Sequence, residues 1–197
     1  MVLTWFRHGS NALLALAMVA VAALFAVGAL PARWYLVPLG AAVFIVTEYA
    51  THRFGFHAPP SNVPAVRAFQ HRMHYDHHKE PERLDLLFLA WWFVVPTSAT
   101  YFGVFWLATR DVASAAALFL GTLVALTYYE WVHYVAHVPY APRSPWARWM
   151  KKYYLWHHFK NERLWFGVTN PSMDVIARSY ARVEDVERSG STRELFS

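Results

Sequence analysis

Histidine is the residue whose number and spacing in this chain point most directly to chemistry. Eleven histidines occur among 197 residues, and nine of them form four short clusters. The clusters are His52 with His57, His74 with His77 and His78, His133 with His137, and His157 with His158. Neutral imidazole is the commonest side-chain metal ligand, and nine imidazoles exceed the four ligands of a tetrahedral ion. The pattern therefore predicts two metals held close together, with redox or hydrolytic chemistry.

The remaining composition limits both the ligands and the class of protein. Cysteine is absent, which excludes disulfides, iron–sulfur clusters and thiolate zinc sites. Hydrophobic residues make up 56% of the chain, more than the roughly 45–50% of a soluble domain. The net charge is +5, but the basic residues flank apolar stretches and form no compact patch. This distribution argues against a nucleic-acid partner and is typical of a membrane protein with basic cytoplasmic loops.

Four apolar segments approach or exceed the length of about 20 residues that a membrane-spanning helix needs. They cover residues 11–30, 35–51, 86–109 and 112–137. We therefore predict an all-α fold over residues 1–197, a single integral membrane domain with four transmembrane helices in two hairpins. Pro96 lies inside the third segment and is expected to kink that helix.

The basic residues also predict an orientation. They are concentrated in residues 52–83 and 138–197, whereas the short turns at Arg33 and Arg110 carry one each. The positive-inside rule places the termini and both long polar segments in the cytoplasm. The histidine boxes, within residues 52–78 and 133–158, would then form a cytoplasmic histidine-rich helical cap. Residues 186–197 are expected to be a mobile polar tail.

Each cluster also has a less specific interpretation. His133 and His137 share a helical face with Glu130, which is predicted to be a ligand or to orient an imidazole, although such a pair is often only hydrogen-bonded. His74, His77 and His78 are expected on one helical face, or alternatively in a solvated basic stretch. His52 and His57 are not at a clean helical repeat, so we expect a turn at Gly55 to bring His57 round.

The aromatic and basic residues around His157 and His158 would alternatively form an interfacial belt. His71 is better interpreted as solvated or as a partner of a ligand. Four clusters together, all at the ends of predicted spans, favour metal binding over these separate interpretations.

Four segments resemble the histidine boxes of the fatty acid hydroxylase superfamily, and most closely its fatty acid 2-hydroxylase branch. They are HRFGFH (52–57), HYDHHK (74–79), EWVHYVAH (130–137) and YYLWHHFKNERLWFGVTNPSMD (153–174). The resemblance covers about residues 40–176 and implies that the nine clustered histidines are metal ligands.

The resemblance also implies a function. It implies two iron ions, with zinc possible in purified samples, that use O2 to hydroxylate or desaturate a lipid drawn from the bilayer, a fatty acyl chain above all. A separate electron donor is implied, either a ferredoxin or a b-type cytochrome with its reductase. The expected location is a bacterial inner membrane, which the protein crosses several times.

Tyr154 departs from the family pattern, because the last box normally starts with histidine at that position. We predict that Tyr154 and Glu130 act in catalysis, with the tyrosine as a ferric phenolate ligand or as a hydrogen-bond partner of metal-bound water. The alternative is a family member that binds metal or lipid with little or no oxygenase activity. A transporter or hydrolase is less favoured, because the chain has no HExxH motif and no charge inside residues 11–30 or 86–109.

Overall fold

The computed structural model describes residues 1–196, and these form helices joined by irregular segments, with no strand among them. The prediction of an all-α fold is therefore confirmed. The chain divides into two compact units, one of Met1–Phe44 with Leu89–Glu130 and one of Ile45–Phe88 with Trp131–Ser197. The expectation of a single membrane domain stays a prediction.

Four helices are long and apolar enough to cross a membrane, as the sequence predicts. The candidate spans are Gly9–Ala26, Trp34–Phe56, Leu84–Thr109 and Val112–His137. They contain the helices α2 (Gly9–Ala26), α3 (Val37–Ala50), α7 (Trp91–Thr109) and α8 (Val112–His137), and a short helix α1 (Val2–Arg7) precedes them. Leu16, Val19 and Val104 are exposed on these helices, as expected of side chains that face lipid.

Two predicted spans differ from the helices at their ends. Helix α2, in the first predicted span, ends at Ala26 rather than at residue 30. Gly28 then takes a left-handed φ of 73° that suits a residue without a Cβ. The third span begins as a separate short helix α6 (Leu84–Leu87), and α7 starts only at Trp91. In the break between them, the Leu89 N–H donates to Glu130 Oε1 at 3.1 Å.

A tight turn at Arg110 and Asp111 joins α7 to α8. Arg110 ends α7 in the left-handed conformation, and its N–H donates to the Trp106 carbonyl at 2.8 Å. The Asp111 carboxylate accepts the Ser114 N–H at 3.0 Å and its hydroxyl at 2.7 Å. This cap satisfies N–H groups that the start of a helix leaves unbonded, so the sequence at the turn specifies a helical hairpin.

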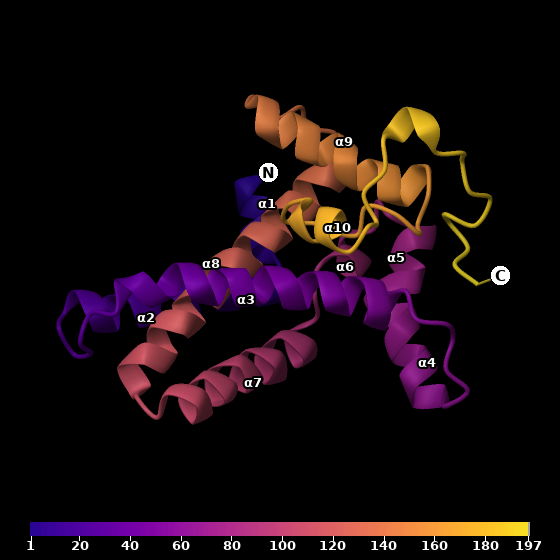
Figure 1. Ribbon diagram of the computed structural model, residues 1–197. Helices are drawn as coiled ribbons and strands as arrows, with labels where there is room; N and C mark the ends of the chain where they lie inside the picture. The colour runs from indigo at the N-terminus through magenta and orange to yellow at the C-terminus, as the bar shows by residue number, and fades with distance from the viewer. Residues whose placement is uncertain (197) are drawn as a thin grey trace. The chain divides into compact units, whose positions relative to one another are not determined.

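Two glycines let α3 and α8 approach closely within the first unit (Figure 1). A Cβ added at Gly40 would lie 1.8 Å from the Leu118 carbonyl oxygen, and one at Gly121 would lie 2.0 Å from the Val37 carbonyl oxygen. Thr122 donates its hydroxyl to the Gly40 carbonyl at 3.2 Å. Small residues with a polar contact are the usual basis of helix pairing in membranes.

The second unit contains the ends of α3 and α8 and a set of short helices. These are η2 (Thr51–Phe56), α4 (Pro64–Gln70), η3 (His71–Tyr75), α5 (Asp76–Lys79), α6, α9 (Pro145–Phe159), α10 (Ser172–Ile176) and η4 (Val183–Asp185). Ser144 caps α9 by accepting the Ala147 N–H at 3.2 Å. Tyr153 on α9 donates to Asp174 on α10 at 2.7 Å, which joins these two helices (Figure 1).

The close approach of α3 and α8 predicts an asymmetric response to glycine substitution. Gly121→Ala should destabilise the protein by about 1–3 kcal/mol, because its methyl group would overlap the Val37 backbone. Gly103→Ala on α7 is the control, since its Cβ would meet nothing within 4 Å. Thermal unfolding of detergent-purified variants measures the difference. Equal melting temperatures for the two variants would contradict the predicted packing.

Candidate metal centre

The nine clustered histidines gather into two groups in the second unit. The first group contains His52, His57, His74, His78 and His157, and the second contains His77, His133, His137 and His158. Within each group the candidate ligand atoms lie within 4.8 Å of one another. Side chains as far apart in sequence as His52 and His157 therefore converge on two neighbouring points, and the nine clustered histidines are brought together there.

The pairing of His52 and His57 depends on the shape of the helix that carries them. Instead of the turn expected at Gly55, the chain continues from α3 into a π-helical turn over Thr51–Phe56. The His57 N–H donates to the His52 carbonyl at 3.0 Å, the five-residue spacing of a π-helix. The wider turn places residues five apart on one side, so both imidazoles enter the first group.

Adjacent histidines divide between the two groups. Successive residues on an α-helix point about 100° apart, so His77 and His78 diverge, and so do His157 and His158. His78 and His157 belong to the first group, whereas His77 and His158 belong to the second. The expectation of one shared face for the histidines at 74–78 therefore holds only for His74 and His78. Each pair of adjacent histidines therefore contributes one candidate ligand to each group.

Backbone carbonyls orient three imidazoles of the first group. The Nδ1 atom of His52 lies 2.5 Å from the Phe166 carbonyl oxygen. The Nδ1 atom of His157 lies 2.8 Å from the Leu164 oxygen, and that of His78 lies 2.9 Å from the Thr192 oxygen. A carbonyl oxygen only accepts hydrogen bonds, so each Nδ1 must carry the proton. Each Nε2 then keeps its lone pair, which is the state that binds a metal.

The ring nitrogens that remain are close to one another rather than to other partners. His74 Nε2 lies 2.7 Å from His57 Nε2, which itself lies 3.0 Å from His157 Nε2. The buried Nε2 atoms of His78 and His137 have no hydrogen-bond partner among residues 1–196. An unsatisfied buried polar atom costs about 1–3 kcal/mol. A metal ion would satisfy these nitrogens, and an all-imidazole donor set suits iron, zinc, copper or nickel.

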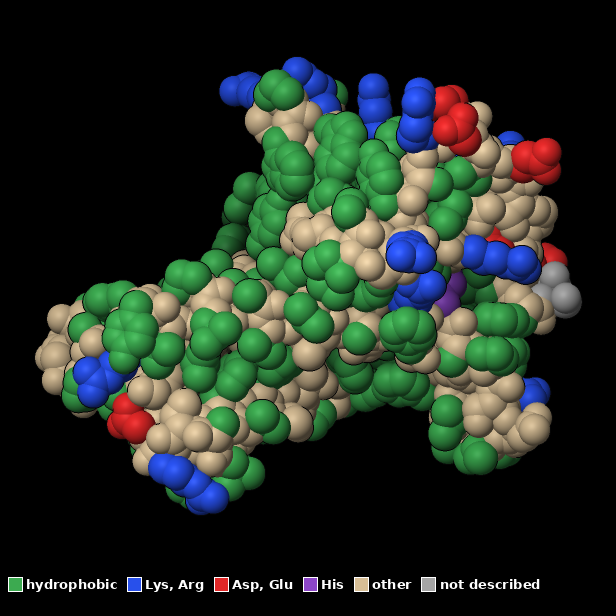
Figure 2. Space-filling view, viewed as in Figure 1, with side chains coloured by type: hydrophobic (Ala, Val, Ile, Leu, Met, Phe, Trp, Pro, Cys, Tyr) green, Lys and Arg blue, Asp and Glu red, His purple; other side chains and the backbone are tan. Residues whose placement is uncertain are grey.

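Burial keeps these imidazoles neutral. Removal from water lowers the pKa of His74, His78 and His157 well below the usual range, and the neighbouring imidazoles lower it further. On the face drawn in Figure 2, only a small patch of histidine surface is visible. Since the neutral ring is the form that binds a metal, the site favours metal over protons at neutral pH.

Asp174 holds the loop whose carbonyls orient His52 and His157. Its Oδ1 accepts the Phe166 N–H at 2.8 Å, and its Oδ2 accepts the Gly167 N–H at 2.7 Å. The Tyr153 hydroxyl donates to Oδ2 as well, at 2.7 Å. Asp174 is fully buried, and these hydrogen bonds compensate its carboxylate, which fixes the loop from inside.

Glu48 holds the same loop from α3. Its Oε1 accepts the Val168 N–H at 3.0 Å, and its Oε2 accepts the Thr169 hydroxyl at 2.9 Å. The supporting roles of Glu48 and Asp174 were missed from the sequence. The only sequence signal was the position of each acid. Glu48 lies one helical turn before His52, and Asp174 ends the last histidine box, residues 153–174.

The remaining predicted residues have different surroundings. The buried Tyr154 hydroxyl lies 3.0 Å from His133 Nε2 and 2.9 Å from His158 Nε2, at the second group. Glu130 belongs to the first unit, where it accepts the Leu89 N–H, and it is in neither histidine group. His71 lies outside both groups and pairs with Asp76 at 2.9 Å. The catalytic roles of Tyr154 and Glu130 stay predictions.

Comparison with known proteins gives one family. The fatty acid hydroxylase model matches residues 37–179. A solved structure described as full-length scs7p, with only its hydroxylase domain visible, superposes with a TM-score of 0.71 and 28% identity. That match covers 95% of this chain and 67% of the other.

The curated relatives include fatty acid 2-hydroxylase of Rattus norvegicus, which is 32% identical over 69% of this chain and 37% of the relative. The ceramide very long chain fatty acid hydroxylase SCS7 of Saccharomyces cerevisiae is 34% identical, over 74% of this chain and 38% of the relative. The chain thus spans well under half the length of either relative.

The contacts of Asp174 predict that it controls metal retention without binding the metal. Asp174→Asn replaces one accepting oxygen with an NH2 group that cannot accept the Phe166 or Gly167 N–H, so the loop should loosen. We expect about 10–100-fold weaker metal binding. Asp85→Asn, at an exposed acid paired with Arg83, is the control. Elemental analysis after graded chelator treatment measures retention, and equal retention in both variants would contradict this role.

Proposed function

Because the chain belongs to the fatty acid hydroxylase family, we propose that it is a membrane enzyme that uses O2 to hydroxylate a lipid, most directly a fatty acyl chain. The observation that carries the proposal is the convergence of nine buried or half-buried imidazoles into a group of five and a group of four. The names of the relatives, fatty acid 2-hydroxylase and ceramide very long chain fatty acid hydroxylase, support an acyl chain as substrate and hydroxylation over desaturation.

The nine histidines would hold two iron ions, one at each group. When bound, the irons would supply the oxidising chemistry that no side chain can perform. The protein contributes position and protection from water. The Phe166 and Leu164 carbonyls hold the Nδ1 protons of His52 and His157, so both Nε2 lone pairs point into the first group. His77, His78, His157 and His158 are almost fully buried, which excludes bulk water from the reaction.

Tyr154 gives the second group a different donor from the first. Its hydroxyl is within hydrogen-bond distance of His133 and His158, so it can donate its proton to one Nε2 or bind a metal as a phenolate. The second candidate function rests on this residue. In this second function, the protein with its altered second group binds metal or lipid with little or no oxygenase activity.

Electrons and orientation complete the proposal. Hydroxylation with O2 consumes two electrons, which the cofactor must receive from outside the site. We propose a separate electron donor, either a ferredoxin or a b-type cytochrome with its reductase. The basic residues of segments 52–83 and 138–197 support cytoplasmic termini and histidines. We propose a bacterial inner membrane as the location and the bilayer as the source of the lipid.

Removal of one ligand from the first group tests the metal centre. His74→Ala should abolish hydroxylation and lower metal content, since His74 Nε2 lies within 3.2 Å of Nε2 of both His52 and His57. His71→Ala, three residues earlier and outside both groups, is the matched control. Mass spectrometry of hydroxylated acyl chains and elemental analysis measure the outcome. Full turnover by the His74 variant would rule out its assignment as a ligand.

A substitution at Tyr154 separates the two candidate functions. If the protein is a working hydroxylase, the wild type turns over and Tyr154→His changes the rate by less than about tenfold, a difference of about 1.4 kcal/mol. If the tyrosine has disabled the second group, the wild type is inactive and Tyr154→His restores turnover. The same acyl-chain assay, supplied with iron and an electron donor, distinguishes the two results.

A further inference from the structure

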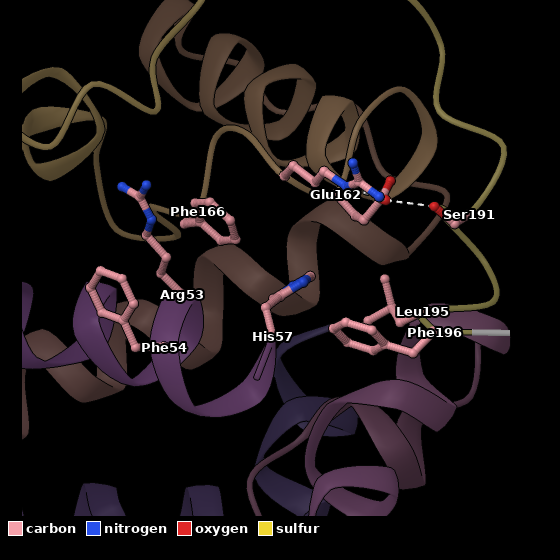
Figure 3. Close-up of a pocket in the computed structure, with 9 residues that line it drawn as sticks. Arg53, Phe54, His57, Glu162, Phe166, Ser191, Leu195 and Phe196 are labelled. Carbon is pink, nitrogen blue, oxygen red and sulfur yellow. Dashed lines mark hydrogen bonds and ion pairs between the residues drawn. The ribbon is translucent and has the colours of Figure 1, made fainter. Parts of the chain in front are cut away.

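The C-terminal segment 189–196 packs against the histidine-rich unit, although it lies beyond the last residue, 179, that the family model matches. Its start is anchored to the end of α9. The Ser189 N–H donates to the Lys160 carbonyl at 2.7 Å. The Ser189 and Ser191 hydroxyls donate to Glu162 Oε1 at 3.1 Å and 2.7 Å, and Figure 3 shows the second of these bonds. Glu162 is buried, so these hydroxyls compensate its carboxylate.

The next residue of the segment contacts the first histidine group directly. The Thr192 carbonyl accepts the Nδ1 proton of His78 at 2.9 Å. Both residues are buried, with 6% and 0% of their surface exposed. His52 and His157 receive the same support from the loop Leu164–Phe166. His78 receives it from the C-terminal segment.

Further contacts hold the end of the segment against two elements that carry ligands. The Arg193 guanidinium lies 5.5 Å from the ring centre of Phe159, at the end of α9. The Phe196 ring lies 5.6 Å from the ring of Tyr75, next to His74. Contacts at Glu162, Phe159 and Tyr75 therefore fix the segment on both sides of Thr192.

The same segment forms one wall of a cavity of about 600 Å³ that opens beside His57. Ser191, Leu195 and Phe196 line it from the C-terminal side, and Arg53 and Phe54 line it from the π-helical turn (Figure 3). His57 is only half-buried, whereas the other four histidines of the first group are buried. The segment thus bounds a cavity that reaches this group.

We propose that residues 189–196 are a working part of the first metal site, in which Thr192 is the positioning residue for His78. The inference rests on the proposed function, because it takes the first group to be a metal site. The Thr192 carbonyl fixes the proton on Nδ1 and increases the basicity of Nε2, as second partners of metal-bound histidines do. Metal binding must in turn stabilise the docked segment, because such coupling is reciprocal.

Two truncations test the proposal. The first ends at Arg188 and removes the segment, and the second ends at Glu194 and keeps the Thr192 carbonyl and the Glu162 contacts. Each is titrated with Zn²⁺ in detergent against a competing chelator. We expect the shorter chain to bind one of two metals about 10–100-fold more weakly and the other unchanged. The longer chain loses the Phe196 contact but keeps those at Glu162 and Phe159, so it should bind the affected metal more tightly than the shorter chain does. Equal affinity in all three proteins would overturn the proposal.

A full-length variant guards against a folding defect in the truncated chain. Ser189→Ala combined with Ser191→Ala removes both hydroxyl anchors at Glu162 and should weaken the same metal, whereas Ser172→Ala on α10 should not. Zn²⁺ should also slow trypsin cleavage after Arg188 and Arg193 in the full chain but not in the double variant. Cleavage of the full chain at the same rate with and without Zn²⁺ would contradict the coupling between metal binding and docking of the segment.

The two levels of the proposal fail differently. If the full chain binds two Zn²⁺ ions and truncation of the segment does not change their affinities, the metal centre is supported and only the role of Thr192 is rejected. If the full chain binds no metal at the first group, both the metal site and the role of Thr192 are rejected.

Discussion

The structure depends on one constraint, which is that nine imidazoles share a single unit largely out of contact with water. Protonated rings would repel one another there, and neutral rings cannot all donate and accept among themselves. His74, His57 and His157 show the problem most clearly, because their Nε2 atoms approach within 2.7 Å and 3.0 Å in succession. One metal at each group would use these lone pairs at once. The rest of the unit is best understood as the support that keeps the lone pairs aimed inward.

That support comes from carboxylates acting through the backbone. Glu48 and Asp174 make no contact with a candidate ligand nitrogen, yet they bind the N–H groups of Phe166 to Val168 and so fix the loop. The loop carbonyls then fix His52 and His157. Because the two acids act through the loop and are not ligands themselves, the first group keeps a donor set of imidazoles while its geometry is still fixed. The C-terminal segment would extend the same arrangement to His78.

The sequence predicts the composition of the site better than its geometry. The helical class, the four spans and the histidine clusters can be read from apolar length and residue type. The π-helical turn at Thr51–Phe56 could not, because periodicity assumes an α-helix and a five-residue spacing then looks irregular. The break at Leu89 was also missed, since the hydrogen bond that the Leu89 N–H makes there is to Glu130, 41 residues away. The division of His77 from His78 follows from helix geometry, but only once the second group is known.

Tyr154 shows where residue type alone is insufficient. Its place in the last histidine box was visible in the sequence, but the contact with His133 and His158 was not. That contact places a phenol at the group of four histidines and leaves the group of five with imidazole alone. The two proposed metals would therefore differ in their ligands, a difference that spectroscopy can detect.

The central claim is that the nine histidines hold two metals, and metal content tests it most directly. Protein from cells grown on iron-57 would be purified in detergent for elemental analysis and Mössbauer spectroscopy. The account predicts about two irons per chain, one for each histidine group, with the magnetic coupling of a pair. One metal or none after iron-replete growth would contradict it and would favour the alternative, in which the altered second group supports little or no oxygenase activity.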